Sequence, residues 1–315
     1  MKGSRSLADS ALTVLAPVVW GSTYLVTTEF LPEGRPLLSS LLRALPAGLI
    51  LVLIGRVLPK GIWWWRALVL GVLNIGAFFY LLFVAAYHLP GGVAALVMAI
   101  QPMIVLLLGA VLLKERIKRL HVAACALGTA GVALLVLQPN AGLNVTGVVA
   151  GLLGALSMAS GIVLTKRWGR PEGVGLLSFT GWQLTVGGLV LLPVTLIGEG
   201  LPSEITATNL WGFAYLGIIG ALIAYAIWFR GVQRLPALTV SFLSFGSPLT
   251  ATLLGWFVLD QSLSPVQILG ALTVVGSVAL AQPRQGKPEP EPDTGPGADT
   301  GPGPVQATTR ESVKA

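Results

Sequence analysis

LGVLNIGAFFYLLFVAAYHLP at residues 70–90 and LGIIGALIAYAIWFRGVQRLP at residues 216–236 are two copies of one pattern. The Leu-Pro pairs that end them place the copies 146 positions apart, from Pro90 to Pro236. A run of roughly 20 apolar residues is long enough to cross a bilayer as a helix. The sequence therefore predicts a membrane protein that contains an internal repeat.

The two copies differ in the charge that follows them. The alignment continues without a gap and brings Pro102 onto Pro248. It then sets KERIKRLH at residues 114–121 against DQSLSPVQ at residues 260–267. Because positive charge marks the cytoplasmic side of a membrane protein, similar units with opposite charge at matching ends are inserted in opposite orientations. Inverted repeats of this kind are typical of secondary transporters.

The composition excludes an ordinary soluble domain. Hydrophobic residues make up 54% of the chain and charged residues 10%, and the mean hydropathy is +0.80. A soluble domain carries about 25% charged residues. The net charge of +7 lies in short clusters between apolar runs. A protein that binds nucleic acid gathers its basic residues on one face, so we do not expect a nucleic-acid partner.

Motifs for catalysis or cofactor binding are absent from the sequence. Cys125 is the only cysteine, so no disulfide framework is expected. His88 and His121 have no partner at metal-ligand spacing, which argues against a metal site. No Walker A, HExxH or GxSxG pattern occurs. We therefore expect no enzyme activity, no catalytic residues and no cofactor.

Ten apolar runs have the length of a membrane-spanning helix. They cover residues 11–31, 37–58, 66–88, 91–113, 119–138, 146–166, 176–198, 209–232, 237–259 and 264–282.

Lysine and arginine fall almost entirely on one side of these ten helices. That side holds Lys2, Arg5, Arg56, Lys60, Arg66, Lys114, Arg116, Lys118, Arg119, Lys166, Arg167, Arg170, Arg230, Arg234, Arg284, Lys287, Arg310 and Lys314. The other side has Arg35 alone, and Arg43 lies inside the second run. This asymmetry predicts that both termini are cytoplasmic, in a multi-pass protein of the bacterial cytoplasmic membrane.

The expected fold is all-α: a polytopic membrane protein with ten transmembrane helices in two inverted five-helix repeats. A cytoplasmic N-terminus at residues 1–10 precedes the first repeat at 11–138, and the second repeat covers 146–282. An odd number of helices per unit makes the second unit enter from the opposite face. Residues 284–315 are rich in proline, glycine and acidic residues, so we expect a disordered cytoplasmic tail.

Polar and aromatic side chains inside the runs are candidates for a substrate site, because polar groups in hydrocarbon are costly unless they have a partner. Gln101 and Ser247 stand just before the paired prolines, at equivalent positions near the expected symmetry axis. The alternative for an amide is an interhelical hydrogen bond, and for an aromatic ring, anchoring at the membrane interface. The candidates are Trp20, Tyr24, Asn74, Tyr80, Gln101, Trp182, Gln183, Tyr225, Trp228 and Ser247.

Arg43 is the only charged residue clearly inside a run, and Glu29 near the outer end of the first run is its candidate partner. One interpretation is a structural ion pair, or an arginine that reaches outward to the membrane surface. The other is an outer vestibule whose cation attracts an anionic group of the substrate.

Several stretches of the chain resemble the EamA family of the drug/metabolite transporter superfamily. The resemblance covers about residues 11–282, and Gln261 replaces in the second half the acidic Glu115 of the first. The stretches that carry it are WGSTYL (20–25), LLRALPAGLIL (41–51), QPMIVLLLGAVLLKERIKRLHVAACALGTAGVALLV (101–136) and SPLTATLLGWFVLDQSLSPVQILGALTVVGSVAL (247–280).

The resemblance implies a secondary transporter for small metabolites, such as amino acids or related solutes. It also implies alternating access, a central cavity lined by both halves and no bound cofactor. The expected partners are a small-molecule substrate and the lipid bilayer, with a homodimer left open. Two other functions stay open: a non-transporting membrane partner or assembly protein, and a membrane enzyme that acts on lipid-linked substrates.

Overall fold

The computed structural model describes residues 2–89, 91–136, 144–202, 204–258 and 264–281. Within these ranges all regular secondary structure is helical. The predicted disordered tail at 284–315 lies outside the described residues, as do the ends of the fifth, ninth and tenth predicted runs. The helices, with η marking π-helical segments, are α1 (Lys2–Thr13), α2 (Leu15–Gly21), α3 (Thr23–Phe30), α4 (Pro36–Gly55), α5 (Trp63–Gly71), η1 (Val72–Gly76), α6 (Ala77–His88), α7 (Gly91–Met98), α8 (Gln101–Leu112), α9 (Arg119–Val136), α10 (Val145–Trp168), α11 (Leu176–Gly198), α12 (Ala207–Gly217), η2 (Ile218–Ile223), α13 (Ala224–Arg234), α14 (Ala237–Leu243), α15 (Gly246–Val258) and α16 (Pro265–Ala281).

Eight helices in the described ranges are long and apolar enough to cross a membrane. Two further apolar helices, Arg119–Leu134 and Pro265–Leu280, are shorter. Helices thus occur at all ten predicted positions. The eight long ones are Leu7–Phe30, Pro36–Gly55, Trp63–His88, Val93–Leu112, Val145–Trp168, Leu176–Gly198, Ala207–Arg234 and Ala237–Val258.

Irregular turns occur at matching places in the two halves. The π-helical segments η1 and η2 begin at Val72 and Ile218, which are 146 positions apart. Turns at residues 99–100 and 244–245 separate α7 from α8 and α14 from α15, within one residue of equivalent positions. Each turn lies just before one of the paired prolines, and proline lacks the N–H group that would continue the helix hydrogen bonds.

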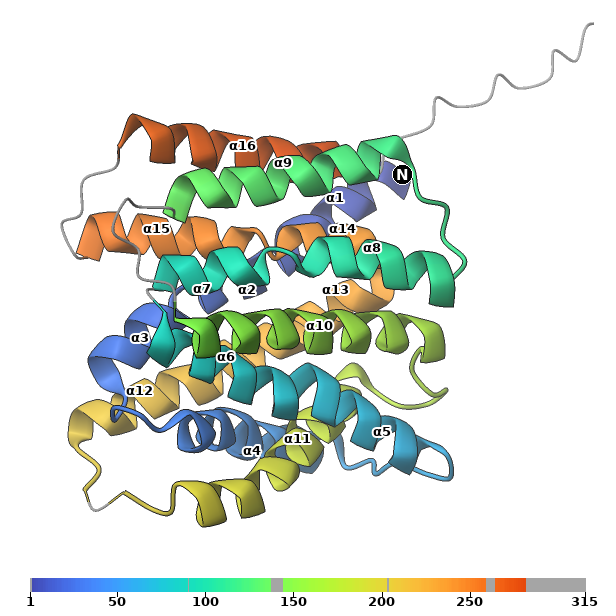
Figure 1. Ribbon diagram of the computed structural model, residues 1–315. Coiled ribbons are helices and arrows are strands. Elements are labelled where there is room, and N and C mark those ends of the chain that lie inside the picture. Colours follow the sequence, from blue (N-terminus) through green and yellow to red (C-terminus); the bar gives the residue numbers. More distant parts are fainter. Residues whose placement is uncertain (1, 90, 137–143, 203, 259–263, 282–315) are drawn as a thin grey trace, which may run out of the picture. The chain divides into compact units, whose positions relative to one another are not determined.

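Helices of the first half pack against helices of the second: α4 against α11, α6 against α10, α9 against α16 and α2 against α15 (Figure 1). Small residues allow the close approach that membrane helices need. A Cβ atom added at Gly188 of α11 would lie 2.8 Å from the Leu45 Cα atom of α4. One added at Gly131 of α9 would lie 3.0 Å from the Gly270 carbonyl oxygen of α16.

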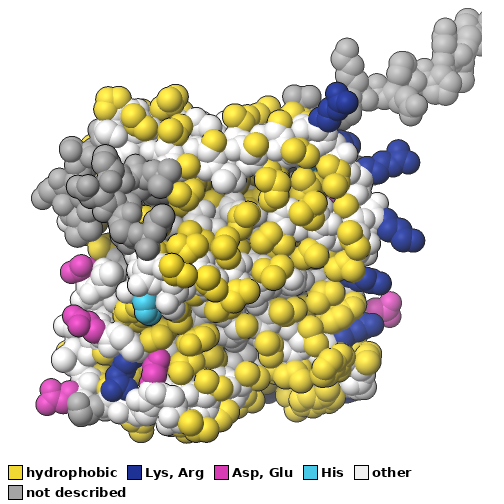
Figure 2. All heavy atoms as spheres, in the orientation of Figure 1, with side chains coloured by type: hydrophobic (Ala, Val, Ile, Leu, Met, Phe, Trp, Pro, Cys, Tyr) yellow, Lys and Arg dark blue, Asp and Glu magenta, His cyan; other side chains and the backbone are white. Residues whose placement is uncertain are grey.

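The surface has an apolar middle and charged ends. Figure 2 shows hydrophobic side chains over the length of the helices, with Lys and Arg gathered at the end where α5 begins and α8 ends. Most of the acidic side chains in this view lie at the opposite end. Large apolar side chains such as Leu53, Val111 and Ile197 are exposed. A surface of this kind suits a hydrocarbon environment between two polar interfaces.

Candidate functional site

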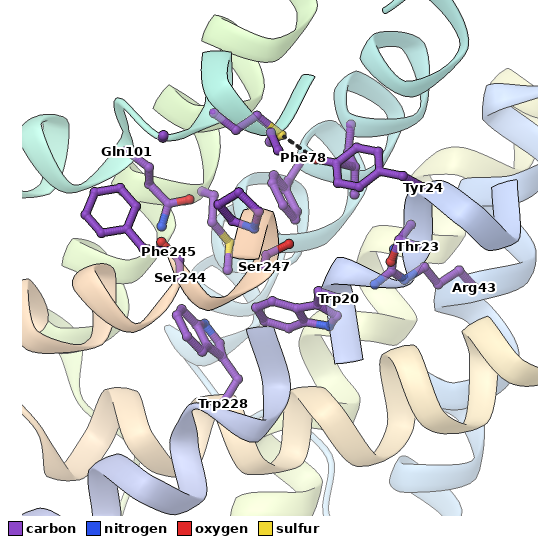
Figure 3. A pocket seen from close by; sticks show the side chains of 16 residues that line it. Trp20, Thr23, Tyr24, Arg43, Phe78, Gln101, Trp228, Ser244, Phe245 and Ser247 are labelled. Carbon is purple, nitrogen blue, oxygen red and sulfur yellow. Dashed lines mark hydrogen bonds between the residues drawn. The ribbon is translucent and has the colours of Figure 1, made fainter. Parts of the chain in front are cut away.

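One cavity lies among helices of both halves and contains about 650 Å³ of space free of atoms, part of it open to solvent. The turns of both halves reach it, through Ala99 and through Ser244 and Phe245. The lining residues are Trp20, Thr23, Tyr24, Arg43, Phe78, Leu82, Ala95, Met98, Ala99, Gln101, Met158, Trp228, Ser244, Phe245, Ser247 and Pro248 (Figure 3).

A cluster of aromatic rings forms one wall of the cavity. The Trp20 ring centroid is 4.8 Å from that of Tyr225 and 5.0 Å from that of Trp228. Tyr225 lies behind this wall, where its ring centroid is 5.5 Å from that of Phe79. The Trp20 Nε1 group donates a hydrogen bond of 2.9 Å to the Gly220 carbonyl oxygen. This bond and the ring contacts fix the orientation of the Trp20 ring.

Arg43 brings a positive charge to the cavity. Its side chain is 1% exposed, and its guanidinium carbon lies 4.6 Å from the Phe79 ring centroid and 6.0 Å from that of Phe83. Its Nη2 atom donates to the Gly220 carbonyl oxygen at 3.3 Å, so Arg43 and Trp20 share one acceptor. Gly220 lies in η2, and π-helical turns are frequent at functional sites.

Several buried N–H donors on the cavity's lining residues have no hydrogen-bond partner in the described part of the chain. They are Nε and Nη1 of Arg43, Nε2 of Gln101 and Nε1 of Trp228. Buried polar groups normally have a partner, because an unpaired one costs roughly 1–3 kcal/mol. These unpaired buried groups are all N–H donors, so an acceptor placed beside them would satisfy them.

The structure brings together many of the residues predicted from the sequence. Trp20, Tyr24, Gln101, Trp228 and Ser247 line the cavity. Arg43 lines it too, although the sequence suggested an outer vestibule. Its expected partner Glu29 is exposed, and no ion pair joins them among the described residues.

Five predicted residues do not line the cavity: Tyr225, which lies behind its aromatic wall, and four that lie elsewhere. Asn74 donates from Nδ2 to Gln183 Oε1 at 2.8 Å and to Thr165 Oγ1 at 3.2 Å, which is the interhelical hydrogen bond considered as the alternative. Trp182 donates from Nε1 to the Val57 carbonyl oxygen at 2.7 Å. Tyr80 is 38% exposed on the outer surface of α6. These side chains do not reach the cavity.

The repeat offset accounts for lining residues that sequence reasoning missed. Pairs of residues 146 positions apart line the cavity together, and applying the offset to Trp228 would have found Leu82. Thr23 was missed although it adjoins Tyr24 and follows Trp20 by three positions, which is a helical spacing. The pairs are Leu82 with Trp228, Met98 with Ser244, Ala99 with Phe245 and Gln101 with Ser247.

The apolar helices, their arrangement and the cavity define a multi-pass membrane protein of the transporter class. The chain belongs to the EamA-like transporter family, whose model matches residues 10–137 and again residues 145–281. The family resemblance in the sequence is thereby confirmed.

Known proteins that resemble the chain cover most of its length. Protein PecM of Dickeya dadantii is 52% identical over 267 residues, which are 85% of this chain and 90% of that protein. The uncharacterized inner membrane transporter YedA of Escherichia coli K12 is 29% identical, over 84% of this chain and 87% of YedA. A probable amino-acid metabolite efflux pump of Salmonella typhimurium is 26% identical, over 87% of this chain and 95% of that protein. The names that state a role describe transporters rather than enzymes.

The fold also matches a solved structure, described only as the crystal structure of a protein. The TM-score is 0.72 at 22% sequence identity, and the match covers 87% of this chain and 97% of the other. At this identity the likeness concerns the fold alone.

Proposed function

We propose that this protein is a secondary transporter that moves a small organic metabolite across the cytoplasmic membrane by alternating access. The observation that carries the proposal is the cavity, which is lined by residue pairs at the repeat offset, such as Gln101 with Ser247. A site shared by equivalent positions of two repeats is where secondary transporters bind their substrates. In this proposal Trp20, Tyr24, Trp228 and the shared pairs hold the substrate.

The proposed topology has ten spans in two inverted repeats, at residues 11–138 and 146–282, with both termini in the cytoplasm. The separate family matches to residues 10–137 and 145–281 support the duplication. The basic side chains gathered at one end of the helices support the orientation (Figure 2). Opening would alternate between the two ends as the packed halves rock against each other.

The proposed substrate is an amino acid or a related solute. The similarity to a probable amino-acid metabolite efflux pump supports this class and favours export. Among the described lining residues none is acidic, so the proton carrier of a carboxylate relay is not on the cavity wall.

The test is flux into liposomes that contain the purified full-length protein. We expect it to move at least one member of a broad panel of organic solutes above the rate of empty vesicles. Trp20→Ala and Gln101→Ala should reduce that flux while leaving membrane insertion intact. The matched control is Tyr80→Ala, an aromatic residue on the outer surface. No flux above empty vesicles for any solute would contradict the proposal, and normal flux in both cavity variants would contradict the site.

A further inference from the structure

We propose that the cavity selects a planar aromatic monoanion, whose carboxylate or similar oxyanion binds Arg43. This inference deepens the proposed function and rests on it. The proposed function names an amino acid or a related solute, and this inference narrows that class to a related solute with a flat ring and a net negative charge, rather than a zwitterionic amino acid.

Arg43 carries a charge that no described residue compensates. An arginine side chain stays protonated in proteins, and a buried charge is costly unless it is paired. The ion pairs among the described residues join Asp9 to Arg230 and Arg234, and leave Arg43 without a counter-ion. The Phe79 ring and the Gly220 carbonyl oxygen offset part of the cost, but Nε and Nη1 remain without partners. An incoming oxyanion would supply both the missing acceptors and the missing negative charge.

The buried polar groups without partners on the cavity's lining residues are N–H donors. Nε2 of Gln101 and Nε1 of Trp228 are buried donors without partners, like those of Arg43. In Figure 3, Arg43 lies beside Thr23 on one side of the view and Gln101 on the other side, with Trp20 between them. A ligand that satisfies both ends carries an anionic group at one end and a neutral acceptor at the other.

Flat aromatic rings make up much of the cavity wall. The rings that line the cavity are those of Trp20, Tyr24, Phe78, Trp228 and Phe245. Aromatic side chains pack favourably against a flat ring in stacked or edge-to-face geometry. An aromatic ring therefore suits the space between Arg43 and Gln101 better than a branched aliphatic group.

The charge on the cavity wall distinguishes an anion from a zwitterion. None of the described lining residues is an aspartate or glutamate that would hold an ammonium group. A zwitterion brings its own positive charge into a cavity that already contains one. A simple aryl carboxylate should therefore bind more tightly than an aromatic amino acid, and an aromatic amine should bind least.

The test isolates the charge with four probes that share one indole ring, which supplies no acceptor to Gln101: indole-3-acetate (anion), tryptophan (zwitterion), tryptamine (cation) and 3-methylindole (neutral). Binding to the full-length protein in lipid nanodiscs is measured by calorimetry. We expect indole-3-acetate to bind at least tenfold more tightly than tryptophan or tryptamine. Arg43→Gln should weaken the binding of indole-3-acetate at least tenfold and leave the binding of 3-methylindole unchanged. Arg43→Lys should retain part of the affinity for indole-3-acetate. The matched control is Arg167→Gln, at an exposed arginine outside the cavity, and should bind as the parent protein does.

The inference would be overturned if tryptophan or tryptamine bound as tightly as indole-3-acetate, or more tightly. It would also be overturned if folded Arg43→Gln kept its full affinity for indole-3-acetate, or if no probe bound at all. If Arg43→Gln does not fold, the relative affinities of the four probes for the parent protein decide whether the inference holds. The liposome panel separates the two proposals. If only cations or zwitterions are transported, the anion site is refuted and the proposed transport function stands. If no solute is transported, the proposed transport function is refuted even if the anion binds.

Discussion

Gly21, at the end of α2, controls how closely the two halves meet beside the cavity. A Cβ atom added there would lie 2.6 Å from the Ser247 carbonyl oxygen and 2.6 Å from the Thr250 Cβ atom of α15. Ordinary contact begins at 3.4 Å, so the atoms would overlap by about 0.8 Å. A carbonyl oxygen cannot turn aside as a side chain can. Gly21→Ala must therefore push α2 and α15 apart, and we expect a loss of about 1–3 kcal/mol of stability.

The assay is thermal denaturation of the detergent-solubilised protein, followed by the fraction that elutes as a single species in size-exclusion chromatography. A loss of about 1–3 kcal/mol corresponds to a fall in apparent Tm of about 2–12 °C for a chain of this size. The scan rate is kept constant, because unfolding of membrane proteins is often irreversible.

The matched control is Gly276→Ala on α16, where an added Cβ atom meets no heavy atom within 4 Å. Because alanine favours a helix more than glycine does, this control should leave stability unchanged or raise it by up to about 1 kcal/mol. If Gly21→Ala and Gly276→Ala denature at the same temperature, the close packing of α2 on α15 is not a determinant of stability and the reasoning is refuted.

Three further substitutions test contacts outside the cavity. Asn74→Leu removes the hydrogen bond to Gln183 and should lower stability by about 1–2 kcal/mol, measured by thermal denaturation. It should leave substrate affinity unchanged, measured by the concentration dependence of flux. Lys166→Met removes the Nζ donor to three carbonyl groups near the end of α13, the nearest at 2.7 Å, and should lower stability by about 1–3 kcal/mol. Asp9→Asn removes a partly exposed ion pair with Arg230 at 2.6 Å, so its cost should stay below about 1 kcal/mol and shrink in high salt.

Each of these three has an outcome that contradicts it. A changed substrate affinity in Asn74→Leu would place that residue in the site after all. For Lys166 the matched control is Arg167→Met at the exposed neighbouring position, and equal stability of the two variants would show that the carbonyl contacts contribute nothing. A cost for Asp9→Asn that is the same at low and high salt would mean that the ion pair is not its source.

Helix positions could be predicted because they depend on apolar length alone. The run predicted at 176–198 is α11, Leu176–Gly198. The two helices that contain the paired prolines are both interrupted just before Pro102 and Pro248. The offset that relates these positions also led to Gln101 and Ser247, which both line the cavity.

The direction in which an individual side chain points from its helix could not be predicted in the same way. A helix that is apolar on every side gives no periodic signal for the side that meets a cavity. Asn74 and Tyr80 both lie in one apolar run, yet Asn74 meets a neighbouring helix and Tyr80 the outer surface. The charge of Arg43 suggested a partner near the membrane surface. Its side chain instead packs on Phe79 inside the protein.

Each of the two π-helical segments holds one residue more than an α-helix of the same number of turns. Removing one residue from η2 would restore an uninterrupted α-helix, and the flanking helices α12 and α13 would keep nearly the same faces because the wide turn already absorbs the extra residue. Tyr225 and Trp228 would stay on the side that meets Trp20. The deletion would instead remove the wide turn whose Gly220 carbonyl oxygen accepts from both Trp20 and Arg43. The number of residues in η2 thus sets the hydrogen bonding of two side chains of the cavity without any change in the side chains themselves.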